Sequence, residues 1–458
     1  MRKLVLSTIF LMVSASLMFG QNLLKDIGSL NRLDYYDPAD STQPYANIAE
    51  NGVRSVEVTN DLDGDGKPEI LATDYTNGGR VHVLEYTDGV LEVVWSSPIQ
   101  YDDNPSSAPR WVQYGDMDGD GNGEIIFPIG PTYEGEIQVW ENVGDNDFGD
   151  EPAISLQADA FTVSGLGRFR TSRERGTVFD FDGDGQSELI TANEDQGVYI
   201  LSLSGSIPGP FTSFEIEGGD PAVVDTNTFS GGSWWHSIPA DINGDGTPEI
   251  INHYWNYGGY WNIEVNGEDD YTYPSQGNPD GGVQGPVYYE YYRDRDVDAV
   301  AFMGINAADV DGNGTDEIFG VNYPVYEGSL VAFGDNTSGT QIWDETVFDS
   351  VMAKPEDITF GESGQFWGAY AADLNQNGRD ELLFGGFYNE QVVAMEYTGS
   401  GDILDGANYE ITQHYAGPPV EEGQWISVTI RDSAGVMDTS YSRGSWVNPG
   451  VMKMSHGD

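Results

Sequence analysis

A nine-residue pattern of acids and glycines occurs six times and constrains the fold of this chain more than any other feature. The first copy runs from Asp61 to Glu69, reads DLDGDGKPE, and is followed at once by the apolar pair Ile70-Leu71. Acidic or amide side chains occupy positions one, three and five of every copy, glycine occupies position six, and glutamate occupies position nine. Six copies in the same register are no chance match, so the chain is built from tandem repeats.

The spacing of these side chains fits a loop that binds Ca²⁺. Calcium takes about six to eight oxygen ligands from carboxylates, amides, backbone carbonyls and water. Oxygens at positions one, three and five converge on one ion if the chain turns sharply between them, and glycine at position six permits the backbone such a turn needs. The carbonyl of position seven and the glutamate of position nine would complete the shell. Magnesium fits less well because it demands stricter octahedral geometry.

The predicted metal ligands are the acidic and amide residues of these loops. They are Asp61, Asp63, Asp65 and Glu69; Asp116, Asp118, Asp120 and Glu124; Asp180, Asp182, Asp184 and Glu188; Asp241, Asn243, Asp245 and Glu249; Asp309, Asp311, Asn313 and Glu317; and Asp373, Asn375, Asn377 and Glu381. The last loop has only two acids among these residues, which puts its affinity for calcium in doubt. The alternative for every copy is a plain Asp/Gly turn that holds no ion.

The distance between loops indicates the architecture. The loops begin at residues 61, 116, 180, 241, 309 and 373, and each is followed by an apolar pair typical of a buried strand. An EF-hand is excluded, because its loop is longer and lies between helices. Three strand-like runs follow the first loop, at 70–75, 80–86 and 91–96, and another precedes it. Four strands per repeat predict an all-β fold, a β-propeller of four-stranded blades packed around a channel.

These loops resemble the FG-GAP/VCBS repeats, which are also found in the head propeller of integrin α subunits. The resemblance rests on the motif Asp-x-Asp-Gly-Asp-Gly-x-x-Glu between a strand and an apolar pair, and it spans roughly residues 50 to 458. It implies a seven-bladed propeller with calcium between the first two strands of some blades. It also implies a metal-ligand role for the loop residues named above.

The start of the chain predicts export. Residues 1–20 place Arg2 and Lys3 ahead of an apolar run that is too short to span a membrane, which is typical of a signal peptide; a retained anchor is the alternative. We therefore expect a secreted or cell-surface protein with no transmembrane segment after signal removal. Residues 21–50 form an N-terminal segment that is a candidate for closing the ring, and residues 51–458 form the propeller.

The end of the chain predicts an incomplete last blade. Residues 451–458 resemble the strand that enters each loop, with Asp458 as position one of a seventh copy. We therefore expect the last blade to be truncated; the alternative is a genuine terminus with the ring closed by N-terminal residues. The long interval after the sixth loop predicts an insertion around residues 423–446.

The composition of the chain excludes some classes of partner and of structure. The chain carries 76 acids against 19 bases, a net charge of −57, so nucleic acid is not an expected partner. With 38% hydrophobic residues the chain can build a core, which excludes wholesale disorder. It contains no cysteine, so no disulfide can rigidify its loops, and calcium is the expected replacement.

Two further segments are candidate ligand surfaces. Residues 234–292 are rich in aromatic side chains, whose exposed rings suit sugars or a protein epitope. The candidates are Trp234, Trp235, Trp255, Trp261, Tyr289 and Tyr291; ordinary blade core is the alternative for part of this set. Arg168 and Arg170 belong to a local arginine cluster that suits a carboxylate-bearing ligand, the alternative being ion pairs within the chain.

No catalytic motif is evident in the sequence, and the five histidines are scattered. The leading hypothesis is therefore a secreted, non-enzymatic binding or adhesion module for a glycan or an extracellular protein. One alternative is a secreted lyase or hydrolase that acts on polysaccharide. The other is a structural part of a larger surface protein. Fold alone does not decide between them.

Overall fold

The structure is a computed structural model of the chain. It describes residues 24–31, 55–59, 61–74, 80–87, 90–98, 109–131, 134–162, 167–171, 176–194, 197–207, 213–218, 234–254, 260–273, 301–323, 328–333, 340–342, 366–375, 377–386, 391–401, 403, 408–416, 424–431 and 439–440. The signal peptide predicted at residues 1–20 and the seventh loop predicted at Asp458 lie outside these residues.

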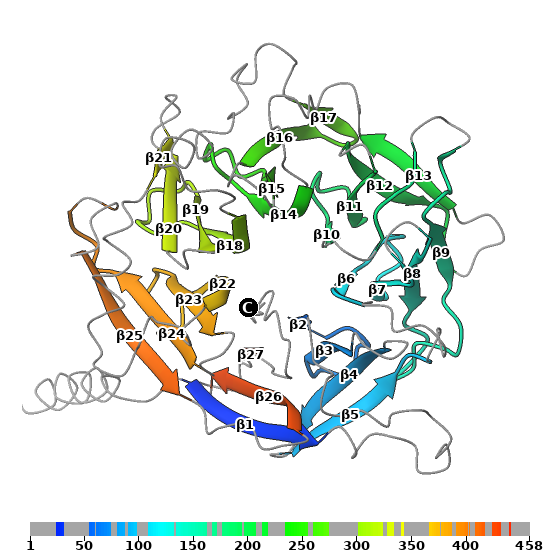
Figure 1. Cartoon of the computed structure of the whole chain (residues 1–458), viewed down its shortest axis with the longest axis horizontal. Coiled ribbons are helices and arrows are strands. Elements are labelled where there is room, and N and C mark those ends of the chain that lie inside the picture. The colour runs from blue at the N-terminus through cyan, green and yellow to red at the C-terminus, as the bar shows by residue number, and fades with distance from the viewer. Residues whose placement is uncertain are drawn as a thin grey trace, which may run out of the picture.

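The described strands form four-stranded antiparallel sheets arranged in a ring, each running in chain order (Figure 1). Blade one contains β2 (Val56–Val58), β3 (Glu69–Asp74), β4 (Arg80–Thr87) and β5 (Val90–Ser96). Blade two contains β6 (Gln113–Gly115), β7 (Glu124–Ile129), β8 (Glu136–Glu141) and β9 (Ile154–Gln157). Blade three contains β10 (Thr177–Phe179), β11 (Glu188–Ala192), β12 (Val198–Ser204) and β13 (Ser213–Gly218).

The second half of the ring repeats this order. Blade four contains β14 (Trp234–Ala240), β15 (Glu249–Tyr254), β16 (Tyr260–Gly267) and β17 (Asp270–Thr272). Blade five contains β18 (Ala301–Ala308), β19 (Glu317–Tyr323), β20 (Gly328–Phe333) and β21 (Thr340–Ile342). Blade six contains β22 (Phe366–Ala372), β23 (Glu381–Gly386), β24 (Gln391–Tyr397) and β25 (Tyr409–Ala416). The prediction of an all-β propeller of four-stranded blades is confirmed.

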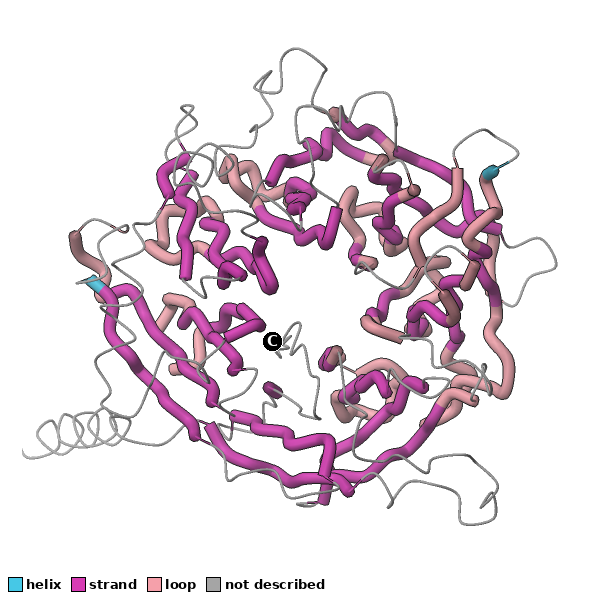
Figure 2. Tube along the Cα trace, in the orientation of Figure 1, coloured by secondary structure: helices cyan, strands magenta, loops and turns pink. Residues whose placement is uncertain are grey.

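The core lies between blades, because each sheet covers a face of the next. All six residues of β7 are buried, as expected of a strand with neighbours on both faces. One apolar cluster joins blades one and two, and in it the fully buried Trp140 packs edge-on against Trp95 at 5.3 Å. Two further clusters join blade two to three and blade three to four. Strands and connecting loops make up nearly all of the described chain (Figure 2).

A three-stranded sheet occupies the remaining sector of the ring (Figure 1). It contains β1 (Leu24–Asn31), β26 (Gln424–Arg431) and β27 (Thr439–Ser440), with β1 antiparallel to β26. Residues 424–431 and 439–440 are the described part of the insertion predicted around residues 423–446, and they lie in this sheet, where β26 pairs with a strand from the start of the chain. The predicted count of seven four-stranded blades is not confirmed, since six sheets among the described residues have four strands. None of the described residues forms a helix with the length and apolar character needed to cross a membrane.

Candidate metal centres

The six acidic repeats form the turns between the first and second strands of the six blades. We number them loop one (61–69), loop two (116–124), loop three (180–188), loop four (241–249), loop five (309–317) and loop six (373–381). Each joins two antiparallel neighbours, for example β2 and β3 in blade one. Because the strand order is the same in every blade, the loops lie on the same face of the ring. The predicted placement between strands is confirmed.

Each loop is wound by hydrogen bonds from its own backbone to its own side chains. The position-one aspartate accepts from the N–H of position six at 2.8 to 3.2 Å in all six loops. The position-five oxygen accepts from the N–H of position seven at 2.7 to 2.9 Å. These contacts turn the side-chain oxygens of positions one and five toward the inside of the loop.

The glycine of position six has the left-handed backbone that the sequence predicts. Its φ lies between 88° and 94° in all six loops. In loop three, a Cβ on Gly185 would meet nothing within 4 Å, so substitution there strains the backbone without a steric clash.

We expect Gly185→Ala to destabilise the chain by about 1 to 2 kcal/mol, the cost of an L-residue in this conformation. The measurement is the urea midpoint in calcium-containing buffer. Gln186→Ala is the matched control, because Gln186 is the next residue in the loop and is not among the residues with a positive φ. This substitution should destabilise the chain by less than about 0.5 kcal/mol. Equal losses in the two variants would contradict the assigned geometry.

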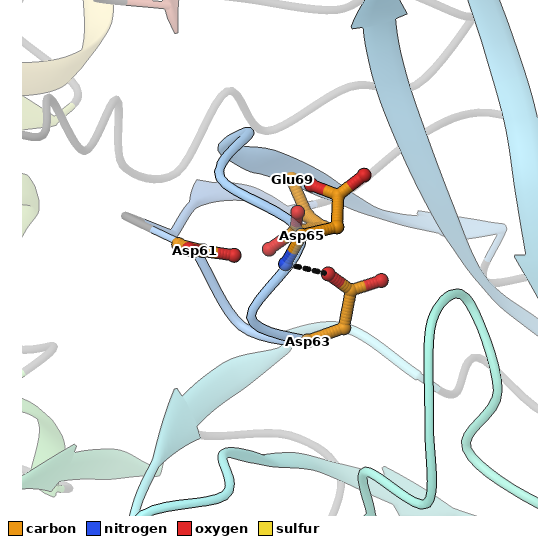
Figure 3. Close-up of side chains that lie close together, drawn as sticks. All are labelled: Asp61, Asp63, Asp65 and Glu69. Atoms are coloured by element: carbon orange, nitrogen blue, oxygen red, sulfur yellow. Dashed lines mark hydrogen bonds between the residues drawn. The ribbon is translucent and has the colours of Figure 1, made fainter.

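The acidic oxygens of three loops converge closely enough to share one cation. One oxygen each from Asp61, Asp63, Asp65 and Glu69 lies within 4.8 Å of the others, and Figure 3 shows these four side chains gathered around one point. The four acids of loop three form the same cluster, as do Asp116, Asp118 and Glu124 of loop two. Clusters of hard oxygen ligands suit a divalent cation such as calcium.

The glutamate of position nine has a second task that the sequence did not predict. Its Oε2 accepts from the N–H of position two at 2.5 to 3.0 Å in all six loops. The side chain of position two is apolar and buried in every loop, at Leu62, Met117, Phe181, Ile242, Val310 and Leu374. The glutamate therefore closes the loop while position two anchors it in the core. The uniform apolar character of position two was the signal available in the sequence.

Two of these glutamates retain an oxygen that is buried and has no hydrogen-bond partner. They are Oε1 of Glu69 and Oε1 of Glu124, on side chains that are 0% exposed. An unsatisfied buried carboxylate oxygen is costly, and a metal ion is one of the few groups that offsets the cost. Loops one and two therefore fit the predicted cation.

The pKa values of the position-nine glutamates are raised, as expected of buried carboxyls that lie among other acids. Burial, with the neighbouring loop aspartates as a smaller cause, raises the pKa of Glu69 to about 7 and that of Glu188 to about 9. Burial together with the adjacent Glu141 carboxyl raises the pKa of Glu124 to about 10. In the absence of a cation, each loop therefore holds its glutamate's proton more tightly than water would.

In loops four and six, the position-nine glutamate has an additional hydrogen bond from within its own loop. Their position-three residue is an asparagine, whose Nδ2 donates to Oε1 of the loop's own glutamate: Asn243 to Glu249, and Asn375 to Glu381 at 2.6 Å. The amide hydrogen thus occupies the side of the glutamate that is bare in loops one and two. Converging acids that fit a cation are therefore shown for the ligand sets of loops one to three.

The position-three aspartate also ties each of the first three loops to the next blade. Asp63 Oδ2 accepts from the backbone N–H of Asn146 at 2.6 Å, and Asp182 Oδ2 accepts from that of Asp269 at 2.8 Å. Asp118 Oδ2 accepts in the same way from Ile207. Each donor belongs to the connection between the third and fourth strands of the following blade. The conformation of a loop is therefore coupled to the packing of two blades.

A second acid faces the loop glutamate in three blades and was missed in the sequence. Glu85, Glu141 and Glu396 pair across the strands with Glu69, Glu124 and Glu381 respectively, and all three are buried. In these three blades the second glutamate follows the loop glutamate by 15 to 17 residues, a signal that is visible only once the strand register is known.

The predicted aromatic surface needs one correction. Trp234 is 0% exposed, packs in the core between blades three and four, and donates from Nε1 to Ser237 Oγ at 3.1 Å. A fully buried ring cannot stack on a ligand, so Trp234 is not a surface residue. Trp235 lies in β14 and Trp261 in β16. Trp255, Tyr289 and Tyr291 lie outside the described residues.

The two predicted arginines, Arg168 and Arg170, differ in exposure. Arg168 is exposed and forms an ion pair with Glu194 at 3.6 Å, whereas Arg170 is only 8% exposed. Arg170 is held by the hydrogen bond from its N–H to the carbonyl of Ala192. The ion pair of Arg168 matches the alternative of pairing within the chain.

One cavity opens between the first three loops. Its volume is about 460 Å³, and Asp61, Asp116 and Asp180, the position-one aspartates, line it together with Tyr114 and Phe179. Phe179 is 37% exposed and packs edge-on against the buried Phe181 at 5.1 Å. The cavity therefore combines acidic walls with an aromatic surface.

The comparison with protein families agrees with the geometry. A family model described as FG-GAP-like repeat matches residues 61–127 and 180–251, which contain loops one to four. The chain carries FG-GAP-like repeats. No curated protein sequence matches it.

Several solved structures are similar to this chain at low sequence identity. BBS1N in complex with ARL6DN is 10% identical, with 93% of this chain and 98% of that chain covered at a TM-score of 0.45. A protein from Lactobacillus plantarum is 10% identical, with 80% and 85% covered at 0.47. The exotype rhamnogalacturonan lyase YesX is 13% identical, with 86% and 74% covered at 0.37. These are likenesses of fold alone.

Proposed function

We propose that this chain is a secreted, calcium-stabilised propeller that acts as a binding or adhesion module for a glycan or an extracellular protein. The observation that carries the proposal is the set of three loops whose acids converge within 4.8 Å, two of them with a buried carboxylate oxygen that has no hydrogen-bond partner. Calcium titration of the metal-stripped chain by calorimetry tests the metal part. No heat of binding at millimolar Ca²⁺ would refute it.

The ring is closed, in this proposal, by a seventh blade that combines both ends of the described chain. The antiparallel pairing of β1 with β26 supports this closure. In Figure 1 their sheet lies between blade six and blade one. A ring joined through its first strand resists opening, because unfolding that sheet requires separation of two distant segments.

The binding surface, in this proposal, is the loop face of blades one to three. The cavity there holds a partly exposed phenylalanine and a tyrosine between acidic loops, and calcium in those loops would neutralise its walls. Aromatic faces beside fixed cations suit a sugar bearing carboxylate groups, as well as an acidic protein segment.

We expect Phe179→Ala to weaken binding of whichever glycans the wild-type chain retains on an array by roughly 30-fold, the loss of one aromatic anchor worth about 2 kcal/mol. The array is read with and without EGTA, and binding should need calcium. Val90→Ala is the control, because Val90 is 52% exposed and does not line the cavity. A reducing-end assay on the retained glycans separates binding from turnover. If Phe179→Ala binds the glycans as tightly as the wild type, the cavity is not the binding site.

A further inference from the structure

Blade two contains a buried pair of carboxylates that no lysine or arginine of the described residues pairs with. Glu124, the position-nine residue of loop two, pairs across β7 and β8 with Glu141. Glu124 is 0% exposed and Glu141 is 6% exposed. Oε1 of Glu124 and Oε2 of Glu141 have no hydrogen-bond partner, so two acceptors are left bare at the floor of one loop.

The corresponding pairs in blades one and six are neutralised by a base at position seven of the loop. Lys67 Nζ donates to Glu85 Oε2 at 2.7 Å, and Arg379 Nε donates to Glu396 Oε1 at 2.8 Å. Both glutamates are about as buried as Glu141, at 5% and 4% exposed. In these two blades, the basic side chain of position seven therefore places a positive charge beside the second glutamate.

Loop two has Asn122 at position seven instead. Its amide carries no charge and turns away from Glu141, donating to both oxygens of Asp120 at 2.8 and 2.9 Å. Among the described residues, no lysine or arginine forms an ion pair with Glu141. Asp116 and Asp118 of loop two converge with Glu124 and add further negative charge beside the pair.

Two buried carboxylates in contact are stable only if they share a proton or bind a cation. A cation bound by the loop aspartates and Glu124 would lie on the side of the loop that Glu141 faces. The difference between blade two and blades one and six is therefore a missing internal charge, not a missing acid.

We propose that Glu141 is an additional calcium ligand of loop two, which makes this loop the tightest calcium site of the described chain. The inference rests on the proposed calcium binding and adds a ligand from outside the nine-residue repeat. A sixth anionic or carbonyl ligand raises affinity because calcium-site affinity follows the number and charge of its oxygen ligands. Asn122 brings no positive charge to Glu141, whereas Lys67 and Arg379 donate to Glu85 and Glu396.

The test is calcium titration of the full-length, metal-stripped chain carrying Glu141→Gln, with Glu396→Gln as the matched control. We expect Glu141→Gln to weaken the tightest class of calcium site at least tenfold, and Glu396→Gln to leave that class unchanged. Without calcium, Glu141→Gln should melt above the wild type because one buried carboxylate has been neutralised, while its melting temperature should rise less on addition of calcium. A purely structural role would not produce these opposite shifts.

The outcomes separate this inference from the function proposed above. A wild-type chain that takes up no calcium refutes the proposed function itself. A wild-type chain that binds calcium, with Glu141→Gln equal to it in affinity, overturns only the role of Glu141. A crystal structure of the calcium-loaded chain gives the direct reading, since a ligand oxygen must lie about 2.3 to 2.6 Å from the ion.

Discussion

Removal of calcium is expected to lower the melting temperature of this chain by roughly 10 °C. An ion that binds only the folded chain contributes about 2.7 kcal/mol per site when its free concentration is 100 times the dissociation constant, so three sites contribute about 8 kcal/mol. A chain of this size unfolds with a large entropy, so each kcal/mol corresponds to only about 1 °C. The converging acids of loops one to three are the expected source of the effect.

The measurement is a thermal melt in 2-fold steps of free calcium, followed by circular dichroism and by scattering. The melting temperature should rise with the logarithm of calcium concentration once the sites are filled. Magnesium at the same concentration should restore little of it, because these loops do not offer the strict octahedral shell that magnesium needs. Identical melting temperatures with calcium, with magnesium and with neither would contradict the prediction that calcium stabilises the chain.

The second expected result is that the metal-free chain is more stable at pH 5 than at pH 9. Burial raises the pKa of the loop glutamates from an ordinary value near 4.5 to about 7 for Glu69, Glu249 and Glu381, about 8 for Glu317 and about 9 for Glu188. A carboxyl whose pKa is raised in the folded state binds its proton more tightly there than in the unfolded chain. The stability that this proton provides is present below about pH 4.5 and is lost as pH rises through the folded-state values.

The loss should amount to several kcal/mol between pH 5 and pH 9, since each pKa unit of difference corresponds to about 1.4 kcal/mol. The global charge of −57 acts in the same direction, because more ionised acids repel one another at high pH. Calcium should reverse the trend, since it binds the ionised loops and its affinity rises as their protons leave.

Urea midpoints at pH 5, 7 and 9, on chain stripped of metal before each measurement, give the free energy of unfolding. Glu188→Gln should flatten the pH dependence because it removes one buried titrating group. Glu151→Gln is the control, since Glu151 is exposed and should leave the pH dependence unchanged. A free energy of unfolding that stays level or rises from pH 5 to pH 9 in the metal-free chain would contradict the raised pKa values.

Local features of the chain were predictable from its sequence because they depend on neighbours within about ten residues. The loop spacing predicts side-chain oxygens that turn inward, and the structure places them there. The glycine of position six predicts a left-handed backbone, which is found in all six loops. The strands after the first loop were predicted at 70–75, 80–86 and 91–96, and β3, β4 and β5 have these bounds to within one residue.

Features that join distant segments were not predictable in this way. The sequence marks Trp234 as one of many aromatic residues, and only the packing of blades three and four makes it a core residue. Residues 21–50 were a candidate for closing the ring, but nothing in the sequence specifies that Leu24–Asn31 pairs with Gln424–Arg431.

The sequence by itself determined the repeat, the loops, the strands within each blade and the chemistry of the candidate ligands, because these follow from contacts inside one repeat. Only the tertiary structure decided what surrounds each loop. Strand register places Glu141 against Glu124, and the packing of one blade on the next places the backbone of Asn146 on Asp63. Burial between blades then fixes the cost of each unpaired carboxylate, and that cost depends on neighbours more than fifty residues away rather than on the motif itself.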